Sequence, residues 1–290
     1  MGDIEKMSNQ DKINKIEFVT GEENIEREPL LDQESQFEIY VSDMEGVKAL
    51  VNVDLALFGT APVPRLPWLF GLKIEMQEPD EDGFYTEEEE KRLQEIQTRA
   101  CYVLQEEGYS KFVGSLTYDG NRMLYFYGKD ENYLPPLVGK IAAEFSDYEF
   151  NFMLDKDGAW QFYLEGLYPS EVDLAHIKNR HMLSHLAESG FDLDKEYPVS
   201  YYFYFQDGAS RGRVASELLM NGFEIIDDKI YVEDLEPMSL GLRMLARHKL
   251  DYLSVTEKTY ECFEALGEMV GIYDGWELTS LDDLAEDEWV

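Results

Sequence analysis

The sequence predicts an α+β protein of two domains, each an antiparallel sheet covered by helices in the split βαβ order of ferredoxin-like folds. Three observations predict this class. The length of 290 residues suits two domains of ordinary size better than one. A hydrophobic content of 44%, with 19 Tyr and 16 Phe, is enough to build two buried cores. Finally, the order β-α-β-β-α-β is indicated in each half.

The first domain is expected over residues 36–169, after a polar and charged segment at 1–35 that is typical of a tail or a loosely attached arm. The domain opens with segments in which apolar and polar residues alternate, which indicates strands with one buried face. These strands are expected at 37–41, 47–58 and 68–76. Three prolines form a stiff connector before the last of them.

The first predicted helix has clear signals at both ends. Thr86 and Glu89 have the spacing of a capping box, and four glutamates at 87–90 place negative charge at the positive end of the helix. Apolar residues then recur at intervals of three and four, which predicts one buried face. Gly108 is the expected stop.

The rest of the first domain is expected to complete the sheet. Asp119-Gly120-Asn121 predicts a tight turn between two strands, and Pro135-Pro136 opens a second helix. Two further segments, 148–154 and 160–164, have the composition of strands and flank an Asp- and Gly-containing turn.

The second domain is expected over residues 170–290 and begins with a helix that Ser170 and Asp173 cap. The aromatic segment 197–205 follows, and its density predicts a central strand buried on both faces. The remaining elements repeat the order of the first domain. They are a helix at 209–221, strands at 223–226, 230–232 and 239–250, a helix capped by Ser254 and Glu257 that stops at Gly271, and a strand at 272–278.

The charge is strongly negative and is shared by both domains. The chain has 61 Asp and Glu against 25 Lys and Arg, a formal net charge of −36. Nucleic acids require a basic surface, so this charge excludes a simple phosphate-backbone binder. Residues 171–290 hold 26 acidic and 10 basic residues, and they end in an acidic tail. The ordinary interpretation of such a surface is solubility, and the functional one is recognition of a basic protein partner.

The sequence also limits the compartment and the thiol chemistry. Its N-terminal residues lack the apolar run of a secretory signal, and no segment reaches the ~18 apolar residues of a membrane span. We therefore expect a cytoplasmic protein without membrane contact. Only two cysteines occur, Cys101 and Cys262, which excludes a disulfide framework. Both lie on amphipathic helical segments, where a buried thiol acts as a small hydrophobe.

A metal site is the strongest catalytic alternative. His181 and His185 are four residues apart on one predicted helix, so their rings share a face, and His176 or Asp192 is a candidate third ligand. No motif of the HExxH type accompanies them, and the neighbouring apolar residues favour packed histidines. The sequence contains no other catalytic constellation, so we expect a protein that is not an enzyme and has no cofactor.

The segment Tyr273-Asp274-Gly275-Trp276, followed by the acidic tail, resembles the closing segment of the bacterial family called regulator of ribonuclease E activity B (RraB-like). The run Leu218-Leu219-Met220-Asn221-Gly222-Phe223-Glu224 and the element order over 174–290 agree with it. The resemblance implies a non-catalytic, acidic α+β protein that binds ribonuclease E and reduces its cutting of selected RNAs. It implies a partner contact for the four matching residues.

The four residues also have a structural interpretation, which the residue types alone favour. Asp-Gly fits a tight turn or bulge, and Tyr273 and Trp276 can hold the last strand against the core. The first domain resembles a second bacterial family, of unknown function, and this resemblance implies no activity. It lies in the segments 83–89, 112–117, 124–127 and 167–169.

Together these observations predict a non-catalytic regulator that inhibits an RNA-processing ribonuclease through an acidic surface. Two other classes stay open. One is a metal-assisted hydrolase that uses His181 and His185, and the other is a sensor that holds a small molecule in an aromatic pocket of the first domain.

Overall fold

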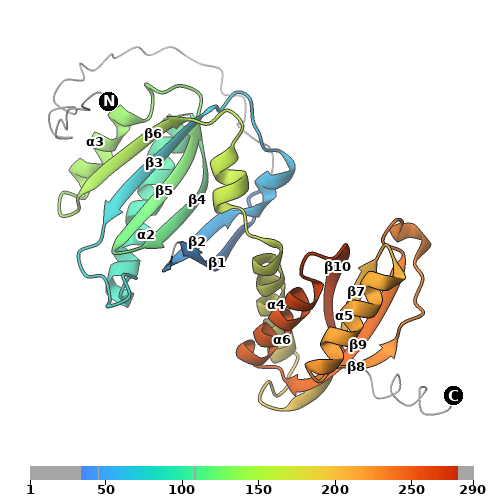
Figure 1. Cartoon of the computed structure of the whole chain (residues 1–290). Helices are drawn as coiled ribbons and strands as arrows, with labels where there is room; N and C mark the ends of the chain where they lie inside the picture. The colour runs from blue at the N-terminus through green and yellow to red at the C-terminus, as the bar shows by residue number, and fades with distance from the viewer. Residues whose placement is uncertain (1–33, 45, 108, 280–290) are drawn as a thin grey trace. The chain divides into compact units, whose positions relative to one another are not determined.

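The computed structural model describes residues 34–44, 46–107 and 109–279, and it divides into two compact units between Tyr168 and Pro169 (Figure 1). Each unit contains an antiparallel sheet flanked by helices, which confirms the predicted α+β class. The helix stop expected at Gly108, the acidic tail and nearly all of the N-terminal arm lie outside the described residues. Within the described part of the chain, no helix is both long and apolar enough to cross a membrane.

The first unit is built on a six-stranded sheet in the order β1-β2-β4-β5-β3-β6. Its strands are β1 (Phe37–Met44), β2 (Val47–Asp54), β3 (Trp68–Glu75), β4 (Ser110–Tyr118), β5 (Asn121–Gly128) and β6 (Phe150–Lys156). β5 lies between β3 and β4, which α2 (Glu87–Cys101) connects, and β3 lies between β5 and β6, which α3 (Pro135–Glu144) connects. This is the split βαβ order, used twice.

The capping signal of α2 is confirmed in one half. The Thr86 side chain accepts a hydrogen bond from the Glu89 backbone N–H at 3.3 Å. The Glu89 carboxylate, however, is buried and turns away from the cap. It accepts from the backbone N–H of Gln77 at 3.2 Å and from the Tyr148 hydroxyl at 3.1 Å. The carboxylate therefore ties the helix to the rest of the fold.

Two of the strand predictions are wrong because a carboxylate starts a helical turn. The strand expected at 47–58 ends at Asp54, whose side chain accepts from Ala56 N and begins a 3₁₀ turn over Leu55–Gly59. The strand expected at 160–164 is a π-helical turn over Phe162–Leu167. There, Asp157 accepts from the backbone N–H groups of residues 161 and 162, both at 2.9 Å.

The second unit is built on a four-stranded sheet in the order β10-β7-β9-β8. Its strands are β7 (Glu196–Phe205), β8 (Glu224–Asp227), β9 (Leu240–Lys249) and β10 (Gly271–Leu278), and its helices are α4 (Glu171–Glu188), α5 (Gly208–Met220) and α6 (Tyr252–Leu266). β9 lies between β7 and β8, and β7 lies between β9 and β10. The split βαβ order therefore occurs twice here as well.

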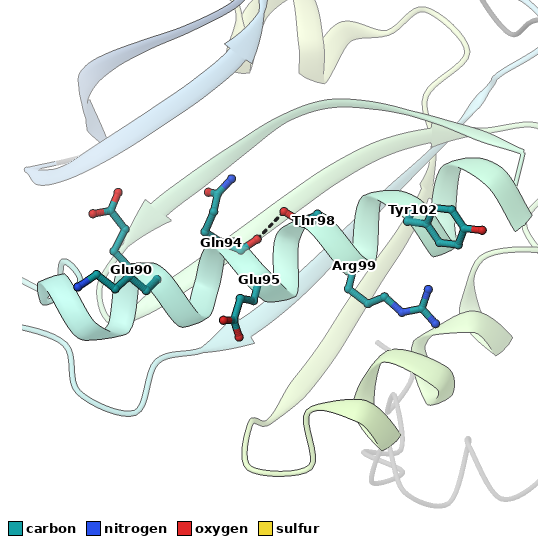
Figure 2. A pocket seen from close by; sticks show the side chains of 7 residues that line it. Glu90, Gln94, Glu95, Thr98, Arg99 and Tyr102 are labelled. Carbon is teal, nitrogen blue, oxygen red and sulfur yellow. Dashed lines mark hydrogen bonds between the residues drawn. The ribbon is translucent and has the colours of Figure 1, made fainter.

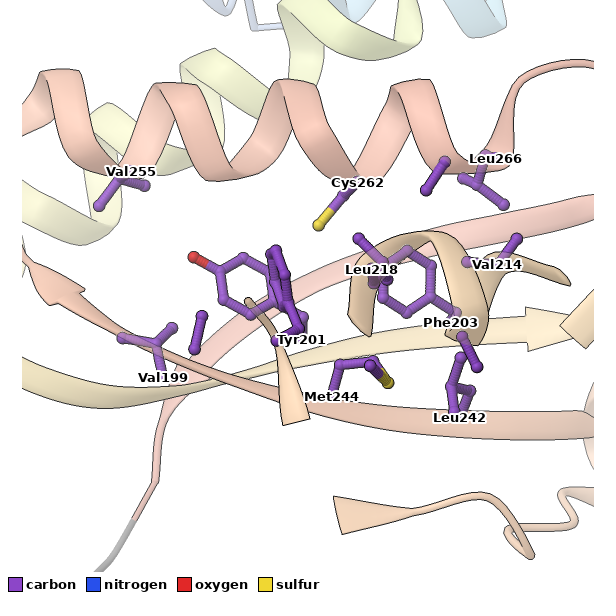
Figure 3. Close-up of a cluster of buried hydrophobic side chains, with 14 of the residues drawn as sticks. Val199, Tyr201, Phe203, Val214, Leu218, Leu242, Met244, Val255, Cys262 and Leu266 are labelled. Carbon is purple, nitrogen blue, oxygen red and sulfur yellow. The ribbon is translucent and has the colours of Figure 1, made fainter. Parts of the chain in front are cut away.

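The core of the second unit lies between the helices and one face of this sheet. In Figure 3, Cys262 of α6 faces Tyr201 and Phe203 of β7, and all three are buried. Tyr202 and Tyr204, on the opposite face of β7, are only partly buried. The expectation that this strand is buried on both faces is therefore wrong, because the helices pack on the face of Tyr201 and Phe203 and leave the opposite face partly exposed.

Two boundaries of the second unit also differ from the expectation. The segment 230–232 forms one isolated bridge, from Tyr231 to Leu240, and no strand. The N-cap residue of α6 is Asp251, whose carboxylate accepts a hydrogen bond from the Ser254 backbone N–H at 2.9 Å. The helix is therefore capped by Asp251 and not, as expected, by Ser254. The same helix ends at Leu266, before Gly267 with a φ of +50°, and Gly271 begins the next strand.

Candidate functional site

A groove of about 470 Å³ lies between α4 and β10 in the second unit. One wall is a single stripe of α4, because its lining residues recur at intervals of three, four and one. The other wall is the start of β10, and Phe263 of α6 also lines the groove. The α4 residues are Glu171, Leu174, Ala175, Lys178, Asn179 and Met182. All four residues singled out by the sequence, Tyr273 to Trp276, lie on the β10 wall.

A chain of hydrogen bonds joins the two walls. Trp276 Nε1 donates to Asn179 Oδ1 at 2.7 Å, and Asn179 Nδ2 donates to Thr259 Oγ1 of α6 at 2.8 Å. The Thr259 hydroxyl donates in turn to the carbonyl of Val255 at 2.9 Å. Asn179 and Thr259 are buried, so this polar chain is fixed within an apolar surrounding. Trp276 therefore anchors β10 to α4.

The other three residues of the segment have distinct local roles. Tyr273 packs on the core, with its ring 5.3 Å from that of Phe263 and 5.4 Å from that of Phe203. Burial raises the pKa of the Tyr273 hydroxyl. The pairing with β7 shifts between Tyr273 and Gly275, so a bulge occurs at Asp274, whose side chain is exposed. The segment thus has the bulge and the anchoring rings that its residue types indicate.

Gly275 allows this bulge, because its φ of +118° is one that residues with a Cβ rarely adopt. We expect Gly275→Ala to lower the free energy of unfolding of the second domain by about 1–3 kcal/mol. No atom lies within 4 Å of the added Cβ, so the cost is conformational. Gly212→Ala, in α5 and also with open space around the added Cβ, should instead stabilise by about 0.4–1 kcal/mol. Urea denaturation distinguishes the two variants, and equal effects would contradict this account.

Sequence reasoning missed Asn179, which holds Trp276 in place. The available signal was a polar amide in a helix among the apolar residues Ile177 and Leu183, where an unpaired amide would be costly. Its partners are 80 and 97 residues away in the chain, so no local pattern identifies them.

In the ranges that the structure describes, the histidines of α4 are not grouped with one another as metal ligands. His181 and His185 are exposed, whereas His176 is buried with its ring 4.7 Å from that of Tyr260. Among the described residues, no group of three or more His, Cys, Asp or Glu side chains is arranged to hold a metal ion. The third ligand that the sequence suggested, His176 or Asp192, is therefore not brought together with the pair.

Burial disfavours the charged form of two histidines of this domain. Burial lowers the pKa of His176, and neither of its ring nitrogens has a hydrogen-bond partner within the described ranges. Burial also lowers the pKa of His248. Its Nδ1 lies 2.6 Å from the Lys249 carbonyl, which only accepts, so Nδ1 carries the proton. Nε2 therefore accepts from the Tyr201 hydroxyl at 2.7 Å.

These histidines predict a pH dependence of stability. The unfolded chain binds protons near pH 6.5, while the folded chain resists protonation at His176 and His248. The free energy of unfolding of the second domain should therefore be greatest above about pH 6.5 and should fall as the pH decreases below it. Urea denaturation between about pH 5.5 and 7.5 checks this, because ordinary carboxyl groups titrate lower. The double variant His176→Leu/His248→Gln should lose most of the dependence, and an unchanged profile in that variant would contradict the assignment.

The cysteines have the character that their helical positions predict. Cys262 is fully buried in the core, and burial raises its pKa well above the usual range. Cys101 is partly buried, and burial raises its pKa to about 12. Neither thiol is poised as a thiolate nucleophile near neutral pH.

A second hollow, of about 790 Å³, lies on the first unit over the outer face of α2 (Figure 2). Its lining residues lie on α2 from Glu90 to Arg99, together with Tyr102, which begins the π-helical turn after that helix, and Figure 2 shows Glu90, Gln94 and Tyr102 along this stretch. The Arg99 guanidinium donates to Glu144 at 2.5 and 2.7 Å, so it is already engaged within the domain. The groove between α4 and β10 is the better candidate, since separate elements converge there.

Comparison with known families agrees with this division of the chain. Residues 35–168 match a family of unknown function (DUF695), and residues 176–278 match the family described as regulator of ribonuclease activity B. Both resemblances noted in the sequence are thereby confirmed. A comparison with curated proteins gave no match. The chain therefore joins a domain similar to a family of unknown function to a domain similar to regulator of ribonuclease activity B.

Proposed function

We propose that the chain is a cytoplasmic, non-catalytic regulator that binds a ribonuclease through its second domain and reduces RNA cleavage. The observation that carries the proposal is the match of residues 176–278 to regulator of ribonuclease activity B. The action proposed is occlusion or remodelling of the ribonuclease, without chemistry by the regulator.

The charge supports a basic partner surface. The formal net charge of −36 repels nucleic acid but attracts the basic surface with which a ribonuclease holds RNA. At physiological ionic strength the Debye length is about 8 Å, so the attraction acts close to contact. Binding by this route weakens as salt rises.

The side chains in and around the groove support a binding role. Two of its polar side chains are occupied in structural bonds, since Trp276 donates to Asn179 and Asn179 donates to Thr259. The hydrogen-bonded pair of Tyr201 and His248 is buried in the core. Covalent catalysis requires a nucleophile and a base that a substrate can reach, and these side chains do not provide that arrangement.

Affinity capture with the full chain tests the proposal. The immobilised protein is incubated with lysate at low and at high salt, and the retained proteins are identified by mass spectrometry. An unrelated acidic protein of similar net charge is the control for non-specific attraction. We expect a ribonuclease to be retained at low salt, to be lost at high salt, and to be absent from the control. Retention of no ribonuclease at either salt would overturn the proposal.

A further inference from the structure

We propose that the second domain takes up an extended basic segment of its partner as an added strand at the free edge of β10, beneath α4. The class of partner rests on the proposed function. What is added is the surface and the mode of binding, which is strand addition.

Within the part of the chain that the structure describes, the edge of the sheet is open at β10. There, this strand is the last in the order β10-β7-β9-β8 and pairs with β7 alone. An edge strand presents unpaired backbone N–H and C=O groups, which are a template for another strand. Ile272, on this strand, and Val270, just before it, are exposed hydrophobic residues. Both the backbone and the side chains of this edge therefore suit a further strand.

α4 lies where it can pack on a further strand added beside β10. Two helices, α5 and α6, pack on the four strands, and α4 packs beside α6 (Figure 1). The stripe of α4 from Glu171 to Met182 faces the groove across from β10. The bond between Trp276 and Asn179 fixes the two walls relative to each other. The groove is therefore preformed, which reduces the ordering cost of binding.

The dimensions suit a short extended segment. The α4 stripe runs from Glu171 to Met182, which is eleven residues further along the helix. At a rise of about 1.5 Å per residue, the stripe is roughly 16 Å long. A strand advances about 3.3 Å per residue, so about five residues fit along the groove. The β10 wall, from Gly271 to Trp276, has a comparable length.

The lining defines the chemistry of the segment. Leu174, Ala175 and Met182 offer apolar contacts on the α4 side. Glu171 and Asp274 are acidic and exposed, against one lysine of the lining, Lys178. Side chains of a strand alternate between two faces, so a segment of alternating apolar and basic residues matches both features.

Charge favours a basic partner segment in this groove over two alternatives, a second copy of the chain and the C-terminal residues of the chain itself. A second copy of the chain would bring a net charge of −36 against the same charge. The last eleven residues of the chain itself contain five acids and would place them beside Glu171 and Asp274. Like charges in contact are unfavourable in both cases, whereas a basic segment is attracted.

The test uses the full chain and a labelled eight-residue peptide of alternating valine and lysine. Fluorescence anisotropy measures its binding at low salt, and hydrogen exchange measures protection of the β10 amides. Two further peptides carry N-methyl groups, one on all the valines and the other on all the lysines. We expect protection at β10, and at least tenfold weaker binding for the methylated peptide whose blocked amides face that strand. Unprotected β10 amides, or equal binding by all three peptides, would overturn the inference.

A matched pair of variants locates the surface. Met182 in the groove is 39% exposed, and Met220 on α5 is 73% exposed. Met182→Lys and Met220→Lys change the net charge equally, but only Met182→Lys should weaken peptide binding, by about tenfold. Equal effects would exclude the groove.

The same two variants separate this inference from the proposed function. If both capture a ribonuclease equally well, the function stands and the docking surface is wrong. If the peptide protects β10 and no ribonuclease is captured, the surface stands and the proposed partner is wrong.

Discussion

Replacing Trp160 with alanine is expected to lower the free energy of unfolding of the first domain by about 3–5 kcal/mol. Trp160 is fully buried, and its ring stacks on that of Tyr127 with centroids 4.1 Å apart. Its Nε1 donates to the carbonyl of Leu66 at 2.9 Å. The alanine variant leaves a cavity and also removes the donor from this carbonyl, so both costs apply.

The backbone at this residue supports the same expectation. Trp160 has a φ of +58°, a left-handed conformation that bulky residues rarely adopt. Such a conformation persists only where the surrounding contacts fix it. The stacking and the hydrogen bond are therefore needed to hold the chain at the start of the turn over Phe162–Leu167.

Urea denaturation of the full chain, followed by hydrogen exchange for each domain, measures the effect. Trp160→Phe is the matched control, because it keeps an aromatic ring and loses the N–H group. We expect a smaller loss in this control, of about 1–3 kcal/mol, from the unpaired carbonyl. A loss below about 1 kcal/mol for Trp160→Ala would contradict the account, as would an equal loss in the second domain.

Replacing Asn179 with alanine is expected to destabilise the second domain by about 2–4 kcal/mol, since each buried polar group left unpaired costs about 1–3 kcal/mol. The variant removes the acceptor of Trp276 Nε1 and the donor to Thr259 Oγ1. It also removes the link between α4 and β10, so binding of the valine–lysine peptide should weaken as well.

A double-mutant cycle with Trp276→Phe isolates this bond. The phenylalanine keeps an aromatic ring on β10 and lacks the N–H group that Asn179 accepts. If the bond forms, Asn179→Ala and Trp276→Phe should be non-additive, with a coupling of about 0.5–3 kcal/mol. Additive effects would show that the two side chains do not interact.

The features that the sequence predicts well are local ones. Thr86 and Ser170 cap helices because each accepts from a backbone N–H three residues ahead, a spacing visible in the sequence. The strand at Leu240–Lys249 follows from the apolar residues that recur at every second position from Leu240 to Ala246. The order of helices and strands along the chain predicts two βαβ units in each domain. The strand pairing in the structure then shows where each strand lies in its sheet.

The features that the sequence does not predict depend on distant partners. The turn after Asp157 is helical because that carboxylate both caps it and accepts from the Tyr127 hydroxyl at 2.5 Å, 30 residues away. Tyr202 and Tyr204 share the composition of their buried neighbours, and only the placement of the helices leaves them half-exposed. For the groove, the sequence indicates the β10 residues from Tyr273 to Trp276 but not the residues of α4 that form the opposite wall.

The most direct test of the central claim is the rate of RNA cleavage by the captured ribonuclease, measured against the concentration of the full chain. We predict that the rate falls in a saturable way at low salt and recovers at high salt. We also predict that Met182→Lys requires a higher concentration than Met220→Lys for the same inhibition. A cleavage rate that stays constant at saturating concentrations of the chain would contradict regulation of the ribonuclease by this protein.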